Sequence, residues 1–398
     1  MSFFTHSTTP RKLSDNVARF RYTSVPVEGG QGALTQGNQI KFRFSSNQDS
    51  WHSPSLSYIL YEFEAKNGAA SLTTAEGVVF NDNIGASLSN GGPSVITLNG
   101  IDVAVAQSPA LTSEMYNRLF LENQVRETVG EPFLGGRSSG DLIQVAYQIP
   151  CGLVLGNDKA IPGGQWVYSV NLSNNFIRDM VTSDGSDVGR SLPNLTITLK
   201  SAQLVCCHVS PQDNMPIPRN IAITCPSIHT QTTTVSADAI HTLAFTVPPS
   251  SKKLLFSTQI ANLSHLSATG CTGLGSGARF QSLQAEYSGE SQPTVPFDQT
   301  GPSIINQYLQ LYNEKMSSGR SGMLTLSEFE QEPVLACHFA KSPDAISTQV
   351  LLRAQINAGS GPGGASTVVC AALHDQSIVI SYNGSGVVDQ VVNSVLSG

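Results

Sequence analysis

The residues best suited to bind a metal are Cys206, Cys207 and His208, three consecutive side chains in the apolar run LVCCHV. Thiolate and imidazole are common ligands of zinc. Successive side chains of a strand point to opposite faces, so Cys206 and His208 could share an ion and Cys207 could not. A structural zinc site needs about four ligands, and no second pair with ligand spacing lies nearby. We therefore expect buried cysteines and no metal here. Cys337-His338 is a weaker candidate still, because its two side chains diverge on a strand.

Two other patterns could serve catalysis or phosphate binding. Glu328 and Glu330 would share one face of a strand, as the paired carboxylates of a glycosidase might, but nothing in the sequence marks a substrate cleft. The glycine-rich segments 273–277 and 359–364 lack the G-x-x-x-x-G-K-[ST] motif and do not lead into a helix. No G-x-S-x-G motif of a serine hydrolase occurs either. The sequence thus predicts a non-enzymatic protein with no catalytic residue, no cofactor and no metal ion.

The composition points to a β-rich protein with large buried contacts. Charged residues make up 13% of the 398 residues and hydrophobic residues 40%. Few charges with many β-branched and turn-forming residues are typical of an all-β protein with long loops. Low charge also fits extensive subunit contacts, whose centres are depleted in charged residues. The net charge of −7 argues against nucleic acid as the main ligand of the whole chain.

The N-terminus is the exception, with a local cluster of basic residues at Arg11, Lys12, Arg19 and Arg21. This segment could contact nucleic acid or an anionic lipid surface. The simpler interpretation is a solvated or partner-bound tail.

The cysteines indicate a reducing compartment during synthesis. There are seven, an odd number without a C-x-x-C motif, and most lie within apolar runs such as IPCGLV and VVCAAL. Free cysteine behaves in such runs as a small buried hydrophobe. The opening residues MSFFTHSTTPRK contain no apolar core of a signal peptide, so we expect a protein that is not secreted.

An internal repeat decides the architecture. The segment Gly136–Asn171 resembles Gly319–Gln355 at an offset of 181 to 184 residues. Both open with Gly-Arg-Ser, run through a strand-like segment to a proline (Pro150 and Pro333), pass an apolar stretch and a turn, and re-enter a strand at a glutamine. One β-rich unit has been used twice.

Each unit is expected to contain about eight short strands, with one helix between the fourth and the fifth. Eight antiparallel strands in two packed sheets form a jelly roll. The sequence therefore predicts an all-β protein of two tandem eight-stranded jelly-roll barrels, each with a short inserted helix. The predicted divisions are an N-terminal arm (1–36), a first jelly roll (37–210), a linker (211–218) and a second jelly roll (219–398). The predicted helices are 113–128, 175–181 (a short turn) and 303–316.

Three segments in this order resemble the double jelly-roll major capsid proteins of icosahedral viruses, a family that includes adenovirus hexon and the capsid proteins of virophages, polinton-like viruses and membrane-containing tailless phages. The segments are Ile149–Asn175, Thr230–Phe256 and Tyr308–Tyr382. At Cys151-Gly152 the chain departs from the more apolar pair usual in the family. The resemblance implies homotrimers in which six jelly rolls form a pseudo-hexagonal capsomer, with a separate penton protein at the vertices and minor or cement proteins between neighbours.

The sequence is therefore interpreted as a structural virion protein, a major capsid protein made in a reducing compartment of the host and located in the capsid. Its basic arm would face the capsid interior and contact an internal membrane, the genome or a minor protein. Two alternatives remain open at this point, since a fold does not fix a function. One is a tandem β-sandwich that binds carbohydrate or a receptor, like a spike or lectin. The other is a single jelly-roll capsid or penton protein.

Overall fold

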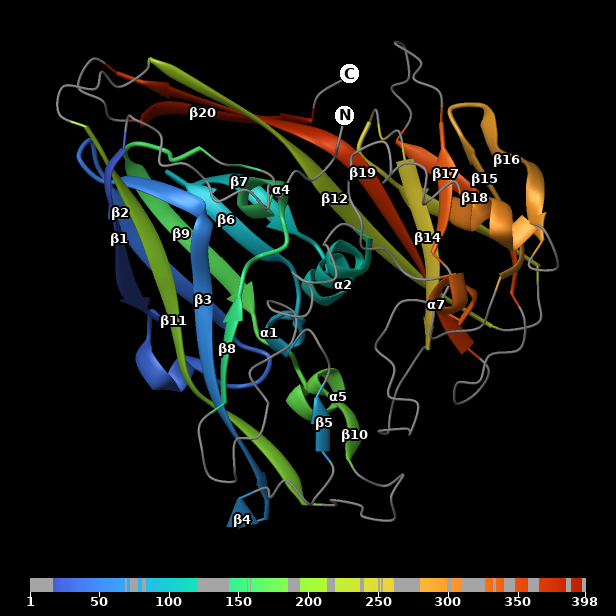
Figure 1. The fold of residues 1–398 in the computed structure, drawn as a ribbon, viewed down its shortest axis with the longest axis horizontal. Coiled ribbons are helices and arrows are strands. Elements are labelled where there is room, and N and C mark those ends of the chain that lie inside the picture. Colours follow the sequence, from blue (N-terminus) through green and yellow to red (C-terminus); the bar gives the residue numbers. More distant parts are fainter. Residues whose placement is uncertain are drawn as a thin grey trace.

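The structure is a computed structural model, and it describes residues 17–68, 70–71, 78–80, 84–119, 143–155, 157, 159–184, 194–212, 219–236, 240–249, 251, 253–260, 280–298, 303–309, 326–331, 334–339, 348–356, 365–383 and 388–395. Figure 1 shows two β-sandwiches side by side, the N-terminal one on the left and the C-terminal one on the right.

The first barrel is built from two antiparallel sheets. One has the order β1-β11-β3, with β4 and β8 also pairing with β3, and the other has the order β2-β9-β6-β7. A separate ribbon is formed by β5 and β10. The strands are β1 (Val17–Pro26), β2 (Gln39–Ser46), β3 (Trp51–Asn67), β4 (Ala70–Ser71), β5 (Val78–Phe80), β6 (Ser94–Leu98), β7 (Ile101–Ala106), β8 (Ile143–Tyr147), β9 (Gly164–Asn171), β10 (Val181–Asp184) and β11 (Leu195–Pro211). The helices are η1 (Gly30–Ala33), α1 (Ile84–Leu88), α2 (Pro109–Leu119), α4 (Gly152–Leu155) and α5 (Phe176–Met180).

The second barrel repeats this plan. Its sheets have the orders β12-β19-β14-β17, with β20 also pairing with β19, and β13-β18-β15-β16. The strands are β12 (Asn220–Ser236), β13 (Ile240–Thr246), β14 (Lys253–Ile260), β15 (Phe280–Tyr287), β16 (Glu290–Asp298), β17 (Leu335–His338), β18 (Gln349–Ile356), β19 (Ala365–Tyr382) and β20 (Val388–Val395). Residues 303–309 are helical, and α7 spans Leu326–Gln331.

The two barrels have the same topology. When the strands are counted in chain order within each barrel, leaving out β4, β5, β10 and β20, one sheet joins the first, eighth, third and sixth strands. The other sheet joins the second, seventh, fourth and fifth. This is the eight-stranded jelly roll. The predicted fold of two tandem jelly rolls is confirmed, and two barrels exclude the single jelly-roll alternative.

Alternation of side chains explains why these segments are strands. On β2, Ile40 and Phe42 are buried while Lys41 and Arg43 face outward. On β18, every second residue from Val350 to Ile356 is buried. A period of two places one set of side chains on the core side of a sheet. Burial of these apolar faces between paired sheets supplies most of the stabilisation of each barrel.

The fourth and fifth strands of each barrel form a hairpin with the same turn. Asn99 and Gly100 have φ of 50° and 82°, and Ser288 and Gly289 have φ of 52° and 77°. Positive φ at both central residues defines the type I′ turn, which matches the twist of the two strands. The Asn-Gly signal was visible in the sequence, whereas Ser288-Gly289 was not predicted as its counterpart.

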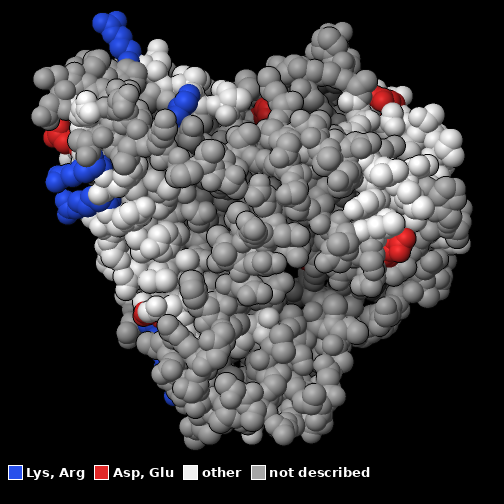
Figure 2. All heavy atoms as spheres, in the orientation of Figure 1, with Lys and Arg blue, Asp and Glu red and all other residues white. Residues whose placement is uncertain are grey.

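The N-terminal arm is shorter than predicted, because residues 17–26 of it form β1. This strand pairs antiparallel with β11 from Val17↔Pro211 to Pro26↔Gln203, so the first sheet begins inside the predicted arm. β1 is an edge strand whose first half is exposed on both faces, with Phe20 42% and Tyr22 54% exposed. It therefore lacks the alternation of buried and exposed side chains by which strands are recognised in a sequence. In Figure 2, Lys and Arg side chains gather at this edge, over β1 and β2. Arg11 and Lys12 lie outside the described residues.

Three details of the predicted secondary structure were also wrong. Helix α2 follows the fifth strand, not the fourth, and it begins at Pro109. The strand-like segment before Pro333 is the helix α7. Each barrel closes with one long strand, β11 or β19, where the sequence predicts two shorter ones, 194–199 and 203–209 in the first barrel and 366–373 and 376–382 in the second. The helical turn at 175–181 is confirmed as α5. The linker remains a prediction, since residues 213–218 lie outside the described residues.

Replacing Gly100 by alanine should lower the stability of the fold by about 1 kcal/mol, because a side chain is disfavoured at positive φ. No neighbouring atom lies within 4 Å of the added Cβ, so backbone conformation alone is tested. The control is Gly32→Ala, which also has open space but no positive φ. Thermal unfolding of both variants checks the prediction. Equal melting temperatures would contradict the assigned turn.

Candidate functional site: the contact between the barrels

The two barrels meet along one half of the sheet formed by β12, β19 and β20. Strand β14 pairs with β19 only as far as Leu373, and β20 pairs with the rest of β19 from Gln376 to Tyr382. Figure 1 shows this part of the sheet crossing the top of the first barrel, above β7 and α4. Here Ile223, Ile378 and Ile380 are 0–1% exposed and belong to the same apolar core as the strands of the first barrel.

The first barrel contributes to the core of the second in return. Leu111 and Met115 on α2 are buried in the second apolar core. The hydroxyl of Thr112, on the same helix, lies 3.5 Å from that of Thr230 on β12. Each barrel therefore completes the core of the other. A large apolar contact of this kind fixes the relative orientation of two domains, whereas small polar contacts allow motion.

Polar side chains of the second barrel cover the exposed edge of β7. The side-chain amide of Gln376 donates to the carbonyl oxygen of Val103 at 3.1 Å, and that of Asn393 donates to the carbonyl oxygen of Asp102 at 2.8 Å. Lys159 of the first barrel donates to the carbonyl oxygen of Ala222 on β12 at 2.9 Å. An uncovered edge strand offers unpaired backbone groups to other chains. This edge is closed by the same contact that joins the barrels.

The contact is too close at Gly152 for any side chain. A Cβ added there would lie 2.3 Å from the carbonyl oxygen of Pro226 and 3.0 Å from the sulfur of Cys225. In this chain the position must therefore remain without a side chain. Burial raises the pKa of both Cys151 and Cys225 to about 12. These thiols therefore stay protonated and act as packing groups.

The Cys206-Cys207-His208 segment has the strand geometry expected from its sequence. Cys206 points into the first core, and His208 lies on the same face, with Nε2 2.9 Å from the hydroxyl of Thr23. Cys207 faces the other side, opposite Tyr22 on β1. All the cysteines that the structure describes are free and buried. Within the described ranges, no three His, Cys, Asp or Glu side chains are grouped so that they could hold a metal ion.

A buried histidine–aromatic cluster in the first barrel was not predicted. His52 is fully buried, with Nε2 2.8 Å from the hydroxyl of Tyr168. Its ring centroid lies 4.8 Å from that of Phe44, 4.7 Å from that of Trp166 and 6.4 Å from that of His208. Burial, with a smaller contribution from the nearby His208, lowers the pKa of His52 to about 3. A neutral imidazole held between aromatic rings is a packing group.

The other candidate residues do not form a site either. Glu328 and Glu330 lie on α7, where residues two apart are separated by about 200° around the axis, so they do not share a face. Cys337 points into the second core, and burial lowers the pKa of its neighbour His338 to about 4. The glycine-rich segments 273–277 and 359–364 lie outside the described residues.

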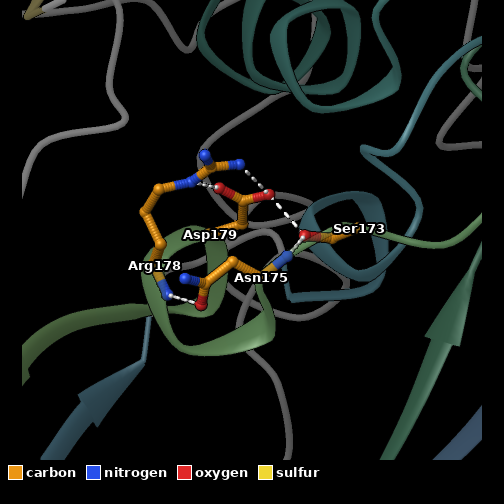
Figure 3. Close-up of polar contacts among 4 residues, drawn as sticks. All are labelled: Ser173, Asn175, Arg178 and Asp179. Carbon is orange, nitrogen blue, oxygen red and sulfur yellow. Dashed lines mark hydrogen bonds and ion pairs between the residues drawn. The ribbon is translucent and has the colours of Figure 1, made fainter. Parts of the chain in front are cut away.

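A buried polar cluster at α5 is structural. The side chain of Asn175 caps the helix by accepting from the backbone N–H of Arg178 at 3.0 Å (Figure 3). The carboxylate of Asp179, 5% exposed, accepts from the guanidinium of Arg178 at 2.6 Å and from the hydroxyl of Ser173. No histidine belongs to this set, so Ser173 has no base to activate it as a nucleophile. Among the described helices, none is long and apolar enough to cross a membrane.

Replacing Gly152 by alanine should weaken the contact between the barrels. Overpacking a closed site costs about 1–3 kcal/mol, and here the obstructing atom is a backbone oxygen that cannot rotate away. We expect a lower melting temperature for Gly152→Ala than for wild type, and more rapid proteolysis between the barrels. Gly32→Ala, which meets no atom within 4 Å, is the control. A wild-type melting temperature for Gly152→Ala would contradict the closeness of this contact.

The cluster around His52 should make the first barrel sensitive to acid. The pKa of His52 is about 3 in the folded chain, against about 6.5 in an unfolded one, so the unfolded state binds more protons between these pH values. The contribution of neutral His52 to the free energy of unfolding is therefore fully present above about pH 6.5. It decreases as the pH falls below that value, by up to about 1.4 kcal/mol per pH unit. His52→Gln should show a smaller loss of melting temperature between pH 7 and pH 5 than wild type. His241→Gln, at the surface of β13, should keep the wild-type loss. If His52→Gln lost as much melting temperature between pH 7 and pH 5 as wild type, His52 would not be the source of the acid sensitivity.

Solved structures match nearly the entire chain, although no protein-family model and no curated protein sequence matches it. A chain of the Sputnik virophage structure determined by cryo-EM has a TM-score of 0.68 at 13% identity, covering 98% of this chain and 91% of that one. The Faustovirus major capsid protein has a TM-score of 0.60 at 9% identity, covering 93% and 92%. The mavirus major capsid protein has a TM-score of 0.59 at 10% identity, covering 98% and 93%. The chain therefore has the double jelly-roll fold of these viral major capsid proteins.

Proposed function

We propose that this chain is a major capsid protein, which assembles as a homotrimer and then into the icosahedral shell of a virus. The observation that carries the proposal is the rigid pairing of two barrels of identical topology. Three such chains present six similar barrels, so a threefold particle acquires a nearly sixfold outline. Such particles can tile the facets of a shell, with penton and minor or cement proteins as further partners.

The chemistry of the described residues supports a structural role. His52 and the described cysteines are packing groups, and the buried carboxylate of Asp179 holds a helix turn. We propose that the protein has no enzymatic activity and acts through packing and symmetry, as part of the virion. Contact of the N-terminal arm with an internal membrane, the genome or a minor protein is now proposed for Arg11 and Lys12, since Arg19 and Arg21 belong to β1.

Neither tryptophan of the chain supplies the exposed aromatic platform of the alternative function, a carbohydrate-binding tandem sandwich. The chain has two tryptophans, and Trp166 is fully buried with its Nε1 donating to Ser46 at 3.0 Å. Trp51 is partly buried, and its Nε1 donates to the carbonyl oxygen of Gln48 at 2.8 Å. Sugar sites in sandwiches depend on exposed aromatic side chains, so the two tryptophans do not favour that function.

The mass of the purified protein in solution tests the proposal. Light scattering should give a stable particle of three chains, each of 42.2 kDa, and electron microscopy should show it with a pseudo-hexagonal outline. A chain that remains monomeric at every concentration and binds glycans would instead support the carbohydrate-binding alternative.

A further inference from the structure

Three basic side chains stand in one row across the edge of the first sheet. Arg21 on β1 pairs with His208 on β11, and His208 pairs with His52 on β3. Directly paired residues of antiparallel strands point to the same side of the sheet, here the side on which Cys206 reaches the first core. Arg21, at the open edge, is exposed, whereas His208 and His52 are 9% and 0% exposed. The row therefore leads from solvent into the core through two titratable rings.

Each of the two histidine rings has a hydrogen-bond partner for one nitrogen only. Nε2 of His208 lies 2.9 Å from the hydroxyl of Thr23 on β1, and Nε2 of His52 lies 2.8 Å from the hydroxyl of Tyr168 on β9. Nδ1 of both rings is buried and has no hydrogen-bond partner among the described residues. A neutral ring tolerates this, because one of its nitrogens carries no hydrogen. A protonated ring would bury a positive charge together with an unpaired N–H, which is costly.

Aromatic rings enclose the two histidines on the core side. From β2, the ring centroid of Phe44 lies 4.8 Å from that of His52 and 6.0 Å from that of His208. From β9, the ring centroids of Trp166 and Tyr168 lie 4.7 Å and 5.8 Å from that of His52. Tyr168 is the titratable group among the three, and burial raises its pKa well above the usual value, so it stays uncharged. None of these rings carries a negative charge that could pair with an imidazolium.

The charges that act on the row are positive. Arg21 faces His208 from β1, and burial, with a smaller contribution from Arg21, lowers the pKa of His208. The ring centroids of the two histidines are 6.4 Å apart, so a proton on one ring disfavours a proton on the other. The backbone of Cys207 favours the charged form of His52, but it is the smallest of the three influences on that ring. In the described part of the chain, no carboxylate is among the groups that shift the pKa of either histidine.

β1 is the element whose movement would admit water to the row. It is the edge strand of its sheet and pairs only with β11 (Figure 1). Phe20 and Tyr22 are 42% and 54% exposed, and Val25 is only partly buried, so β1 contributes little apolar surface to the core. An edge strand of this kind opens locally at a lower free energy than the barrel as a whole. Its separation from β11 would remove the β1 neighbours of His208 and expose that ring to water.

We propose that β1 is an acid-released strap, which separates from β11 when His208 takes up a proton from water and pairs with β11 again at neutral pH. The open form binds the proton because its imidazole is hydrated and no longer faces Arg21, so a falling pH draws β1 into that form. Because β1 directly follows the N-terminal arm, its release lengthens the arm by the 10 residues of the strand. The inference concerns a single chain and does not depend on the proposed capsid function.

Amide hydrogen exchange of the purified full chain, followed by mass spectrometry and corrected for the intrinsic rate at each pH, tests the proposal. Residues 19–25 of β1 should lose protection by about tenfold between pH 7 and pH 5, because a hydrated imidazole with a pKa of about 6.5 is almost wholly charged at pH 5. The limit for one histidine over this range is about 25-fold. β18 in the second barrel should remain protected at pH 5, which would show that β1 opens by itself.

Three single variants separate the effect of the row from other effects of acid. His208→Gln keeps a donor for Thr23 but takes up no proton, so its loss of β1 protection should fall below about twofold. Arg21→Gln removes the neighbouring charge from an exposed position and should lose less protection than wild type. Arg19→Gln is the matched control, because Arg19 is also exposed on β1 but faces Ser210 instead of a histidine. It should lose as much as wild type. Melting temperatures at pH 7 verify that each variant is folded.

A loss of β1 protection at pH 5 in wild type and in Arg19→Gln, with little loss in His208→Gln, supports the strap. Equal protection of β1 at pH 7 and pH 5, or an unchanged acid response in His208→Gln, overturns it. Simultaneous exchange of β1 and β18 also overturns it, because acid would then unfold the whole chain. If His208→Gln does not fold, Arg21→Gln decides, since an acid response equal to that of Arg19→Gln would contradict the proposal.

Discussion

Burial of the ends of β12 and β19 against the first barrel is the interaction on which the rest of the structure depends. Each fully buried isoleucine contributes about 1.5–3 kcal/mol, and Ile223, Ile378 and Ile380 are all buried there. Without this contact, two barrels joined by a short segment would reorient independently. With it, the chain is one rigid body with two similar faces. A nearly sixfold arrangement of three chains requires that rigidity, since the angle between the barrels must be the same in every copy.

The fold was predictable from the sequence where one side of a strand is buried and the other is not. β2 and β18 show this alternation plainly, and the repeat is also correct, because Gln165 and Gln349 lie in the equivalent strands β9 and β18. β1 was missed because both of its faces are exposed at its start, so its pattern resembles a tail. The segment of α7, LSEFEQ, was predicted as a strand because six residues are too few to distinguish the period of a strand from that of a helix. Its helical form is stabilised by the packing of Phe329, which is fully buried. β11 was predicted as two strands because the polar residues between them coincide with the register shift at Leu199/Ser201, through which the strand continues.

The candidate site was harder to predict because its residues act through distant neighbours. The alternation of Cys206 and His208 follows from strand geometry alone, but their surroundings do not. The cluster around His52 unites side chains of β2, β3, β9 and β11, which are up to 164 residues apart between Phe44 and His208. Gly152 lies in an apolar run where nothing in the sequence required a glycine, because the backbone oxygen that requires one belongs to the other barrel. If the chain acts through packing, as proposed, its functional groups are contacts, and a single sequence does not reveal which contacts form.

The contact between the barrels can be wholly apolar for a physical reason. It forms once, during folding, and its surfaces are never presented to solvent afterwards, so Ile378 and Ile380 need no charge to keep the folded chain from associating indiscriminately. The low share of charged residues, 13% of the chain, agrees with this use of apolar surface, because each barrel buries its own core and part of the other's.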